Sequence, residues 1–420
     1  MKKKVIIGLL TGVLFLHLFL NGCIEMEQNQ ESINEISEEK TEDINIEDSV
    51  YVPDEEGYFS LIDQGYNTMV KSQIGGTCWV NAASTSMESS YYLLHEDIIN
   101  INAMQILDYV HGNDKQEGYF LKDGVNGQEL GGWSWQIIET LSNGFGEYVL
   151  VEAVDYSEVS VDEIKNAIRT YGGMYVAVND TSAMGRHNGY MTINEPDLES
   201  FDHSVVLVGW DDNFPKEYFS KEASVNGAWL AQNSLSDAWG NDGYYWISYD
   251  MAFREQTIFI LSEEYSKVLS YDGGKENVIQ TGTDTVVGNI FHEPGKLAAV
   301  GTYISEEQQD IVIEIYDVET KELIYAKEEH FELPGYYVVP LDEILNVNHY
   351  MMVIHYNGAA PVEGESWSDM FIEYRVGAGS DESYVLLDGV WKDMSDSDIK
   401  EYLGIDFVPN NCCIKALYVE

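Results

Sequence analysis

Between about residues 58 and 264, the chain combines two hydrophobic periodicities. Apolar residues recur at helical spacing in three segments, which predicts helices over 78–94, 134–141 and 161–171. Short apolar runs then take over and predict strands over 174–178, 204–210, 228–232 and 244–249. Helices first and strands later are typical of an α+β domain with two lobes.

From about residue 265, helical periodicity fades. Short strand-like runs follow one another between Gly, Asn and Asp residues, over 296–304, 310–316, 336–339, 350–356, 370–374, 383–387 and 413–419. This spacing is typical of a β-sandwich or jelly roll. The predicted fold class is therefore α+β, with a two-lobed domain at 58–264 followed by an all-β sandwich at 265–420.

The N-terminus has the pattern of an export signal. Three lysines precede an apolar run over 5–20, and Leu20-Asn21-Gly22-Cys23 follows. This resembles a bacterial lipoprotein signal, which implies removal of residues 1–22 and lipid attachment to Cys23. An uncleaved membrane anchor is the alternative, but the run is short for a span. We expect an exported protein anchored to the membrane, on the outer face of the cytoplasmic membrane.

Residues 23–57 are rich in Glu, Asp, Asn, Gln and Ser, which predicts a disordered acidic tether. The whole chain carries a formal net charge of −51. We expect no nucleic-acid partner, because phosphate contacts need a basic patch and none is visible. We also expect no cofactor and no metal. The run at Asp211-Asp212-Asn213 lacks the spaced ligands of a calcium loop, so a solvated turn is favoured.

The chain has four cysteines. With Cys23 assigned to lipid, only Cys78, Cys412 and Cys413 remain, which is not the evenly paired set of a disulfide framework. For the adjacent Cys412 and Cys413, two buried thiols are favoured over a vicinal disulfide or an external pair. Cys78 has no evident disulfide partner and is open to another role.

Cys78 stands at the predicted start of a helix, after a glycine-rich turn. A cysteine attacks as its thiolate, which the positive end of a helix dipole and a neighbouring imidazolium both favour. Taken alone, Cys78 would be read as an inert buried thiol. His203 before a Val-rich strand and Asn233 after another change that reading, since a carboxamide can orient an imidazole. His187 is the rival base, but its polar, Gly-flanked setting favours a solvated loop.

These motifs together resemble the papain-like cysteine peptidases. The resemblance implies that Cys78 is the nucleophile, His203 the base and Asn233 its orienting partner. It also implies that the Gln73 side chain and the Cys78 amide hold the oxyanion. Glu88 matches an acidic residue of the family's central helix.

A second element of the resemblance is Gly131-Gly132-Trp133. In the family, the matching Gly-Gly element lines the cleft and pairs with the substrate backbone, so these three residues are predicted to bind substrate. An ordinary tight turn is the alternative for this element.

The chain departs from the family pattern at three positions. Gln73 stands five residues before Cys78, where the family usually has six. Gly75 replaces a cysteine that commonly forms a disulfide. Leu235 replaces a tryptophan that shields the His–Asn hydrogen bond, so we expect a looser pairing and lower activity.

The downstream part resembles the lectin-like β domain of some bacterial and archaeal surface peptidases, through Tyr271-Asp272-Gly273-Gly274 and residues 296–301. Two hypotheses follow. The first is a cell-surface cysteine endopeptidase that hydrolyses polypeptide substrates through an acyl-enzyme. The second is a catalytically weak or silent surface adhesin. In both, surface glycans or cell-wall components are candidate partners of the β domain.

Overall fold

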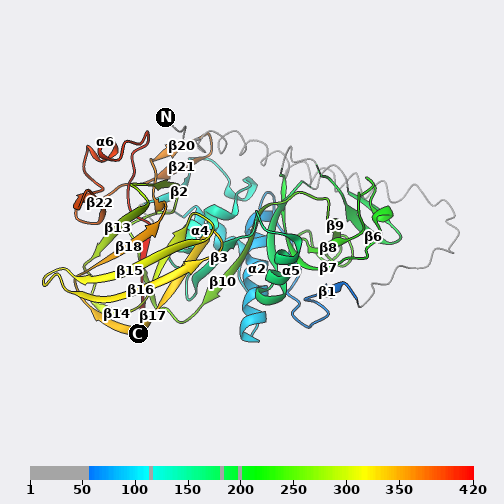
Figure 1. Ribbon diagram of the computed structural model, residues 1–420. Helices are drawn as coiled ribbons and strands as arrows, with labels where there is room; N and C mark the ends of the chain where they lie inside the picture. Colours follow the sequence, from blue (N-terminus) through cyan, green and yellow to red (C-terminus); the bar gives the residue numbers. More distant parts are fainter. Residues whose placement is uncertain (1–55, 113–116, 180–183, 197–200) are drawn as a thin grey trace, which may run out of the picture. The chain divides into compact units, whose positions relative to one another are not determined.

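The computed structural model describes residues 56–112, 117–179, 184–196 and 201–420 (Figure 1). The predicted signal, the lipidation residue Cys23 and nearly all of the predicted tether lie outside the described residues. The chain groups into two compact units. Unit 1 contains the described residues up to Ile106 and those within Asn126–Ser134 and Tyr156–Ile258. Unit 2 contains Leu107–Val125, Trp135–Asp155 and Phe259–Glu420.

The three predicted helices are present as α2 (Cys78–His95), α4 (Ser134–Leu141) and α5 (Val161–Tyr171). In unit 1, α2 is buried over most of its length and contacts two strands of the sheet. The helix α5 contacts one strand of the same sheet. A capping box starts α5 and Gly172, with φ 109°, ends it. The sequence prediction missed one longer helix, α3 (Ala103–Val110), and the short segments η1 (Gly127–Glu129) and η2 (Lys216–Tyr218).

The sheet of unit 1 positions the candidate site. Its strands follow the order β10 (Arg254–Ser262, of which the first part belongs to unit 1), β4 (Met174–Val178), β7 (His203–Asp211), β8 (Ala228–Gln232), β9 (Tyr244–Ser248), β6 (Tyr190–Ile193) and β5 (Met184–His187). β1 (Tyr58–Ser60) pairs with β7. The predicted strands among these were found within one or two residues. The strands β1, β5, β6 and β10 were not predicted. In β10 the first four residues are polar, which hides the apolar run that follows.

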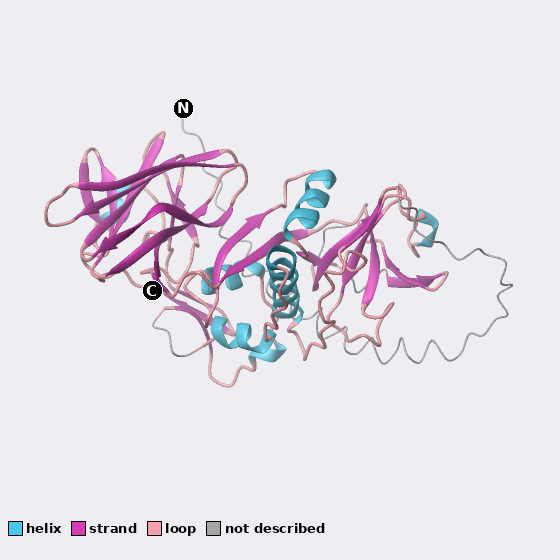
Figure 2. Ribbon diagram, turned by 90° about the horizontal axis from the view of Figure 1, so that it is seen from below, coloured by secondary structure: helices cyan, strands magenta, loops and turns pink. Residues whose placement is uncertain are grey.

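Unit 2 is dominated by strands (Figure 2). One sheet has the order β16 (Leu323–Phe331), β15 (Gln309–Asp317), β18 (Tyr350–Asn357), β13 (Asp284–Phe291), β22 (Ser383–Leu387) and β23 (Val390–Asp393). A second run of paired strands consists of β11 (Lys267–Leu269), β24 (Ile414–Val419), β14 (Gly295–Ile304), β17 (Gly335–Val347) and β3 (Val149–Asp155). Smaller pairings join β2 (Gly118–Leu121), β21 (Ile372–Arg375) and β20 (Trp367–Ser368), and join β12 (Asn277–Ile279) to β19 (Ala360–Val362).

The core of unit 2 draws alternate residues from both larger sets of strands, as in a sandwich. Val287, Ile313 and Ile354 come from one set, and Val300 and Ala416 from the other. The prediction missed several strands of unit 2, of which β13 and β16 are the longest. In β16 the buried alternation is weak, because it is an edge strand with several exposed residues. The short helix α6 (Ile399–Leu403) was also missed.

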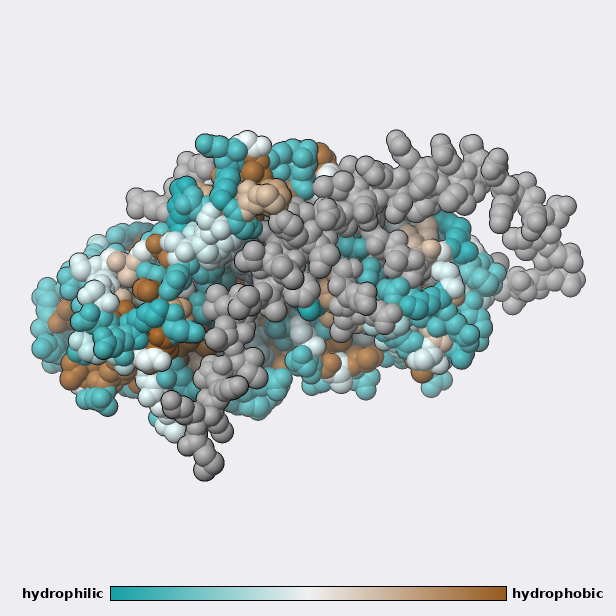
Figure 3. All heavy atoms as spheres, turned by 90° about the horizontal axis from the view of Figure 1, so that it is seen from above, coloured by the Kyte–Doolittle hydropathy of each residue, from teal (hydrophilic) through white to brown (hydrophobic). Residues whose placement is uncertain are grey.

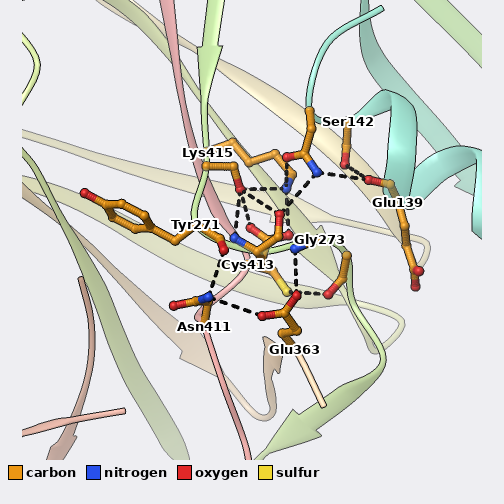
Figure 4. Close-up of polar contacts among 12 residues, drawn as sticks. Glu139, Ser142, Tyr271, Gly273, Glu363, Asn411, Cys413 and Lys415 are labelled. Carbon is orange, nitrogen blue, oxygen red and sulfur yellow. Dashed lines mark hydrogen bonds and ion pairs between the residues drawn. The ribbon is translucent and has the colours of Figure 1, made fainter. Parts of the chain in front are cut away.

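A buried polar cluster lies inside unit 2 (Figure 4). Lys415 Nζ is 2.7 Å from Asp272 Oδ1, and both side chains are fully buried. The same ammonium donates to Asn143 Oδ1 at 2.9 Å and Ser270 Oγ at 3.1 Å, so its three hydrogens all have acceptors. A buried ion pair needs such extra bonds to offset its desolvation.

Cys412 and Cys413 are free and buried, which confirms the prediction of two buried thiols. Burial raises the pKa of the Cys412 thiol to about 12. A thiol held in its protonated form is a poor nucleophile. Because both thiols are fully buried, the pair belongs to the interior of unit 2.

No helix among the described residues is long and apolar enough to cross a membrane. On the face drawn in Figure 3, most described side chains are hydrophilic, with hydrophobic residues in small groups. The described residues also contain no group of three or more His, Cys, Asp or Glu side chains that could hold a metal ion.

Candidate active site

Cys78 is the first residue of α2 and is completely buried in unit 1. The preceding Thr77 locks the turn before it, since its hydroxyl accepts from Ile74 N at 3.2 Å and donates to Ile74 O at 2.9 Å. The positive end of the helix dipole favours the thiolate form of a cysteine at this position. The prediction that a helix begins at Cys78 is therefore confirmed.

Residues from three other segments pack around Cys78. The thiol forms a buried cluster with Trp133, Ala177 and Phe201. Ala177 lies on β4, where the next residue, Val178, pairs with His203 at the start of β7. The register of these two strands therefore brings His203 to the neighbourhood of Cys78.

The side chains of His203 and Asn233 form a hydrogen bond with each other. His203 Nε2 lies 2.8 Å from Asn233 Oδ1, and both residues are buried. A carboxamide oxygen only accepts, so the bond holds the proton on Nε2 and leaves Nδ1 as the nitrogen that can exchange one. Asn233 follows β8, which pairs with β7, and its own amide donates to Gly243 O at 2.9 Å. Antiparallel pairing thus aligns two residues that are thirty positions apart.

Gln73 is tied to the residue after Asn233. Its Oε1 accepts from Ser234 Oγ and its backbone amide donates to Ser234 O, each at 2.7 Å. Its Nε2 donates one hydrogen to Gly75 O at 2.9 Å. A primary amide has a second hydrogen that these contacts leave unused. The shortened turn therefore holds the Gln73 side chain in place through its own backbone.

Glycine is required where this turn meets the segment before α4. Gly75 has φ 58°, and a Cβ there would lie 2.5 Å from Gln128 O. Gly76 N donates to the same oxygen at 2.9 Å. Further along, a Cβ on Gly132 would lie 2.6 Å from the Trp79 ring. The backbone of the predicted substrate-binding element thus packs directly on the residue after Cys78.

Of that element, Trp133 joins the cluster around Cys78 and Gly132 covers Trp79, while Gly131 is buried beside them. The element thus lies beside Cys78. His187 is exposed on β5, with its ring 4.8 Å from that of Tyr218.

The expected effect of Leu235 on the histidine is not seen in the geometry. Leu235 is half-buried and forms an isolated bridge with Ser72. Even so, His203 and Asn233 are only 0% and 2% exposed and their bond is formed. Shielding from water is therefore achieved without the tryptophan of the family pattern.

Two features nearby were not fully anticipated. Lys71 Nζ lies 2.7 Å from Glu88 Oε1, an almost fully buried pair, and burial raises the pKa of Glu88. Glu88 also accepts from Ile101 N at 2.7 Å, which links α2 to the start of α3. Glu255 was missed altogether: its carboxylate accepts from Ser134 N at 3.1 Å.

The turn at Asp211-Asp212-Asn213 is held by protein groups. Asp212 Oδ1 is 2.5 Å from Lys165 Nζ and accepts from Tyr249 OH at 2.7 Å. Asn213 N donates to Asp211 Oδ1 at 2.9 Å. These contacts account for the acidic run as a turn anchored to α5.

Two family models match this chain, one for each part of it. A family model described as "Papain family cysteine protease" matches residues 62–263, and one described as "Lectin like domain" matches residues 270–418. Residues 62–263 are thus similar to the papain family cysteine proteases, and residues 270–418 are similar to the lectin-like domain family. The predicted resemblance to papain-like peptidases and to a lectin-like β domain is thereby confirmed.

The curated relatives are distant. Cysteine proteinase 1 of Zea mays is 28% identical over 209 residues, covering 45% of this chain and 55% of the relative. Procathepsin L of Mus musculus is 24% identical over 204 residues, covering 45% and 59%. A viral cathepsin of Heliothis zea nuclear polyhedrosis virus is 25% identical, covering 44% and 51%. The chain thus spans little more than half the length of the curated relatives it matches.

One similar solved structure contains the cysteine protease and lectin-like domains of Cwp84, a surface layer associated protein of Clostridium difficile. Its TM-score with this chain is 0.70, at 17% sequence identity. That match covers 94% of this chain and 96% of the other. A second structure of the same protease, a variant with one cysteine replaced by alanine, after propeptide cleavage, also has a TM-score of 0.70, at 18% identity. The similarity extends over both domains, and it is a similarity of fold.

Proposed function

We propose that the protein is a cell-surface cysteine endopeptidase that cleaves polypeptides through a Cys78–His203–Asn233 site. The observation that carries the proposal is the buried 2.8 Å hydrogen bond between His203 and Asn233. His203 pairs with the end of β4, and Ala177 of β4 packs in the same cluster as Cys78. A thiol at a helix start, an oriented imidazole and a carboxamide are the groups that thiol peptidases use.

In the proposed reaction, the Cys78 thiolate attacks the carbonyl carbon of the scissile bond. The oxyanion accepts from the Cys78 backbone amide and the second hydrogen of Gln73 Nε2. The C–N bond then breaks, and the His203 imidazolium gives its proton to the departing amine. Water, deprotonated by His203, attacks the resulting thioester, and release of the carboxylate product restores the thiol.

The backbone of Gly131 and Gly132 is proposed to pair with the substrate backbone, with Trp133 beside the substrate side chains. Its support is the packing of Gly132 on Trp79 and of Trp133 on Cys78. This direct contact with the start of α2 favours a cleft wall over an ordinary turn.

An electrophilic probe for thiol peptidases tests the proposal on the folded, full-length protein under reducing conditions. We expect labelling of the wild type, none in Cys78→Ala, and a large loss in His203→Ala, because the imidazole no longer supports the thiolate. His187→Ala is the matched control, since this exposed histidine should not matter. An unlabelled wild type, or label that persists in Cys78→Ala, would overturn the proposal.

The second candidate is a silent surface adhesin, favoured by the lectin-like match over residues 270–418. In either case we propose surface glycans or cell-wall components as ligands of this domain. A full-length chain that the thiol probe does not label, but that binds purified cell-wall material, would support the adhesin. An active enzyme that binds no such material would remove the ligand proposal.

We further propose the following organisation: a signal at 1–22, a lipidated Cys23 with a tether at 23–57, a two-lobed peptidase domain at 58–264 and a β-sandwich at 265–420. The charged and apolar pattern before Cys23 supports export, and the similar fold of a surface-layer associated protease is consistent with a surface location. Cys23→Ala should release the protein from the membrane fraction. Retention of that variant in the membrane would favour an uncleaved anchor.

A further inference from the structure

The buried polar cluster of unit 2 brings an amine, a carboxamide and a carboxylate into contact (Figure 4). Lys415 Nζ lies 2.9 Å from Asn143 Oδ1 and 2.7 Å from Asp272 Oδ1. The side chains of Lys415 and Asp272 are completely buried, and Asn143 is half-buried. An amine that touches the oxygen of a carboxamide is close to its carbonyl carbon, which is one bond away. The cluster therefore holds the two groups that can condense to an amide, with an acid–base group beside them.

Hydrogen bonds hold the carboxamide of Asn143 in this orientation. Its Nδ2 donates to Asp272 O at 3.2 Å and to Glu139 O at 3.3 Å, so its oxygen is the atom that faces Lys415. The carboxylate of Asp272 is also fixed, because its Oδ2 accepts from Ser270 Oγ at 2.5 Å. Groups that are already held in contact lose little further freedom on the way to a transition state.

The surroundings exclude water from the amine and the carboxylate. The Tyr303 ring lies 5.9 Å from Lys415 Nζ, and the Tyr336 ring lies 5.0 Å from that of Tyr303. Both tyrosines are almost fully buried. Because charges are costly away from water, a proton transfer over 2.7 Å from Lys415 to Asp272 is favoured by the loss of both charges. That transfer produces the free amine, which is the nucleophilic form of a lysine.

We propose that Lys415 and Asn143 form an isopeptide bond, an amide between their side chains, with Asp272 as the proton-transfer group. Lys415 gives a proton to Asp272, and its free amine attacks the carbonyl carbon of Asn143. Asp272 passes this proton to the side-chain nitrogen of Asn143 and takes a second one from the attacking nitrogen. The C–N bond then breaks and ammonia leaves. A neutral amide and a neutral Asp272 carboxyl group remain, so the step needs no oxidant and no other reactant.

The bond would join two parts of unit 2 that are 272 positions apart in the chain. Asn143 lies just after α4, and Lys415 lies on β24. Exported domains commonly use disulfides for such links. In the part of the chain that the structure describes, Cys78, Cys412 and Cys413 are all free. An isopeptide bond would supply a covalent link that reduction does not break, and it would replace a buried ion pair by neutral groups.

The alternative is a permanent ion pair in which Asn143 is only an acceptor. Peptide mapping by mass spectrometry separates the two, on full-length protein that is reduced and denatured before digestion. We expect a linked pair of peptides, one with Asn143 and one with Lys415, lighter than their sum by one ammonia. The linked pair is the diagnostic species, because an Asn-Gly sequence can also lose ammonia by cyclising on the Gly144 amide. That amide donates to Leu141 O at 3.0 Å.

Two variants test the assigned roles. Asn143→Ala removes the carboxamide at a half-buried position, and Asp272→Asn keeps the shape of the side chain but cannot relay the proton. Both should lose the linked pair, and near-ultraviolet circular dichroism checks that each is folded. Lys296→Arg, at an exposed lysine of the same unit, is the matched control and should keep it. Wild-type chains cut once between positions 143 and 415 should stay joined on a reducing, denaturing gel, whereas cut Asn143→Ala chains should separate.

The wild type decides the inference even where a variant fails to fold. If its peptides with Asn143 and Lys415 are found only unlinked, no isopeptide bond forms and the cluster is an ion pair. A linked pair that persists in Asn143→Ala would show that Lys415 bonds to another group, which also overturns the inference. A linked pair that persists in Asp272→Asn would remove the proton-transfer role of Asp272.

Discussion

A single oxygen at Asn233 serves two donors. Oδ1 accepts from His203 Nε2 at 2.8 Å and from Ser234 N at 2.7 Å, inside a buried site. The second bond fixes the carboxamide so that its oxygen, rather than its NH₂ group, faces the imidazole. At this scale, the proposed function depends on the orientation of the His203 ring.

Asn233→Ala should therefore lower activity without removing the nucleophile. The imidazole loses its acceptor, and the loss of a charged hydrogen bond predicts a fall in kcat/KM of about 10- to 100-fold. Steady-state kinetics on a fluorogenic peptide would measure it. Asp237→Ala, exposed in the same loop, is the control. Equal kcat/KM in Asn233→Ala and wild type would contradict the orienting role.

Among the helices of unit 1, α5 shows how local sequence and packing combine. Ser160 Oγ accepts from Glu163 N at 3.3 Å, while Glu163 Oε2 accepts from Ser160 N at 2.8 Å. The next turns bury Ile164 and Ile168 and place Arg169 5.0 Å from the Trp210 ring on β7. The helix thus begins at a residue defined by sequence and is held by contacts that only the sheet supplies.

Ser160→Ala should destabilise the protein by about 1 kcal/mol, the usual cost of losing a side-chain N-cap. Urea unfolding of the full-length chain would show a lower midpoint with an unchanged m-value. Thr170→Ala, exposed at the far end of the same helix, should leave the midpoint nearly unchanged. Equal midpoints for both variants would mean that the capping box does not contribute to stability.

Across the whole molecule, acidic groups dominate, and several in unit 2 are shielded from water. Burial raises the pKa of Glu276 to about 7, and burial with the nearby charge of Glu382 raises that of Glu117 to about 7. Burial holds the pKa of Glu139 and Glu363 well above the usual range. Such carboxyls are protonated in the folded chain at a pH where the unfolded chain has lost those protons.

The sign of the pH dependence follows from this difference. A raised folded-state pKa contributes stability below the unfolded value of 4.5, and that contribution is lost as the pH rises through about 7. Glu276→Gln stays neutral and keeps an acceptor for Trp367 Nε1. Its melting temperature should therefore fall less than that of wild type between about pH 5 and pH 8. Glu373→Gln, at an exposed carboxylate, is the control; identical pH slopes for wild type and Glu276→Gln would contradict the shift.

The sequence by itself determined the main elements and the candidate chemistry. Helical periodicity and a glycine-rich turn are local signals, so α2, α4 and α5 and the position of Cys78 could be read directly. The residues His203 and Asn233 were also accessible, because each stands at the end of a strongly apolar strand. Polar or edge strands such as β10 and β16 gave no comparable signal.

Tertiary structure decided what the local pattern does not encode. The shielding of His203 without a tryptophan depends on strand pairing and packing among segments far apart in sequence. The burial that shifts the carboxyl groups of unit 2 arises in the same way. The placement of Glu255 depends on the register shift where β10 pairs with β4. Periodicity reports which face a residue prefers, whereas the geometry of a site comes from contacts that form only when the whole domain has folded.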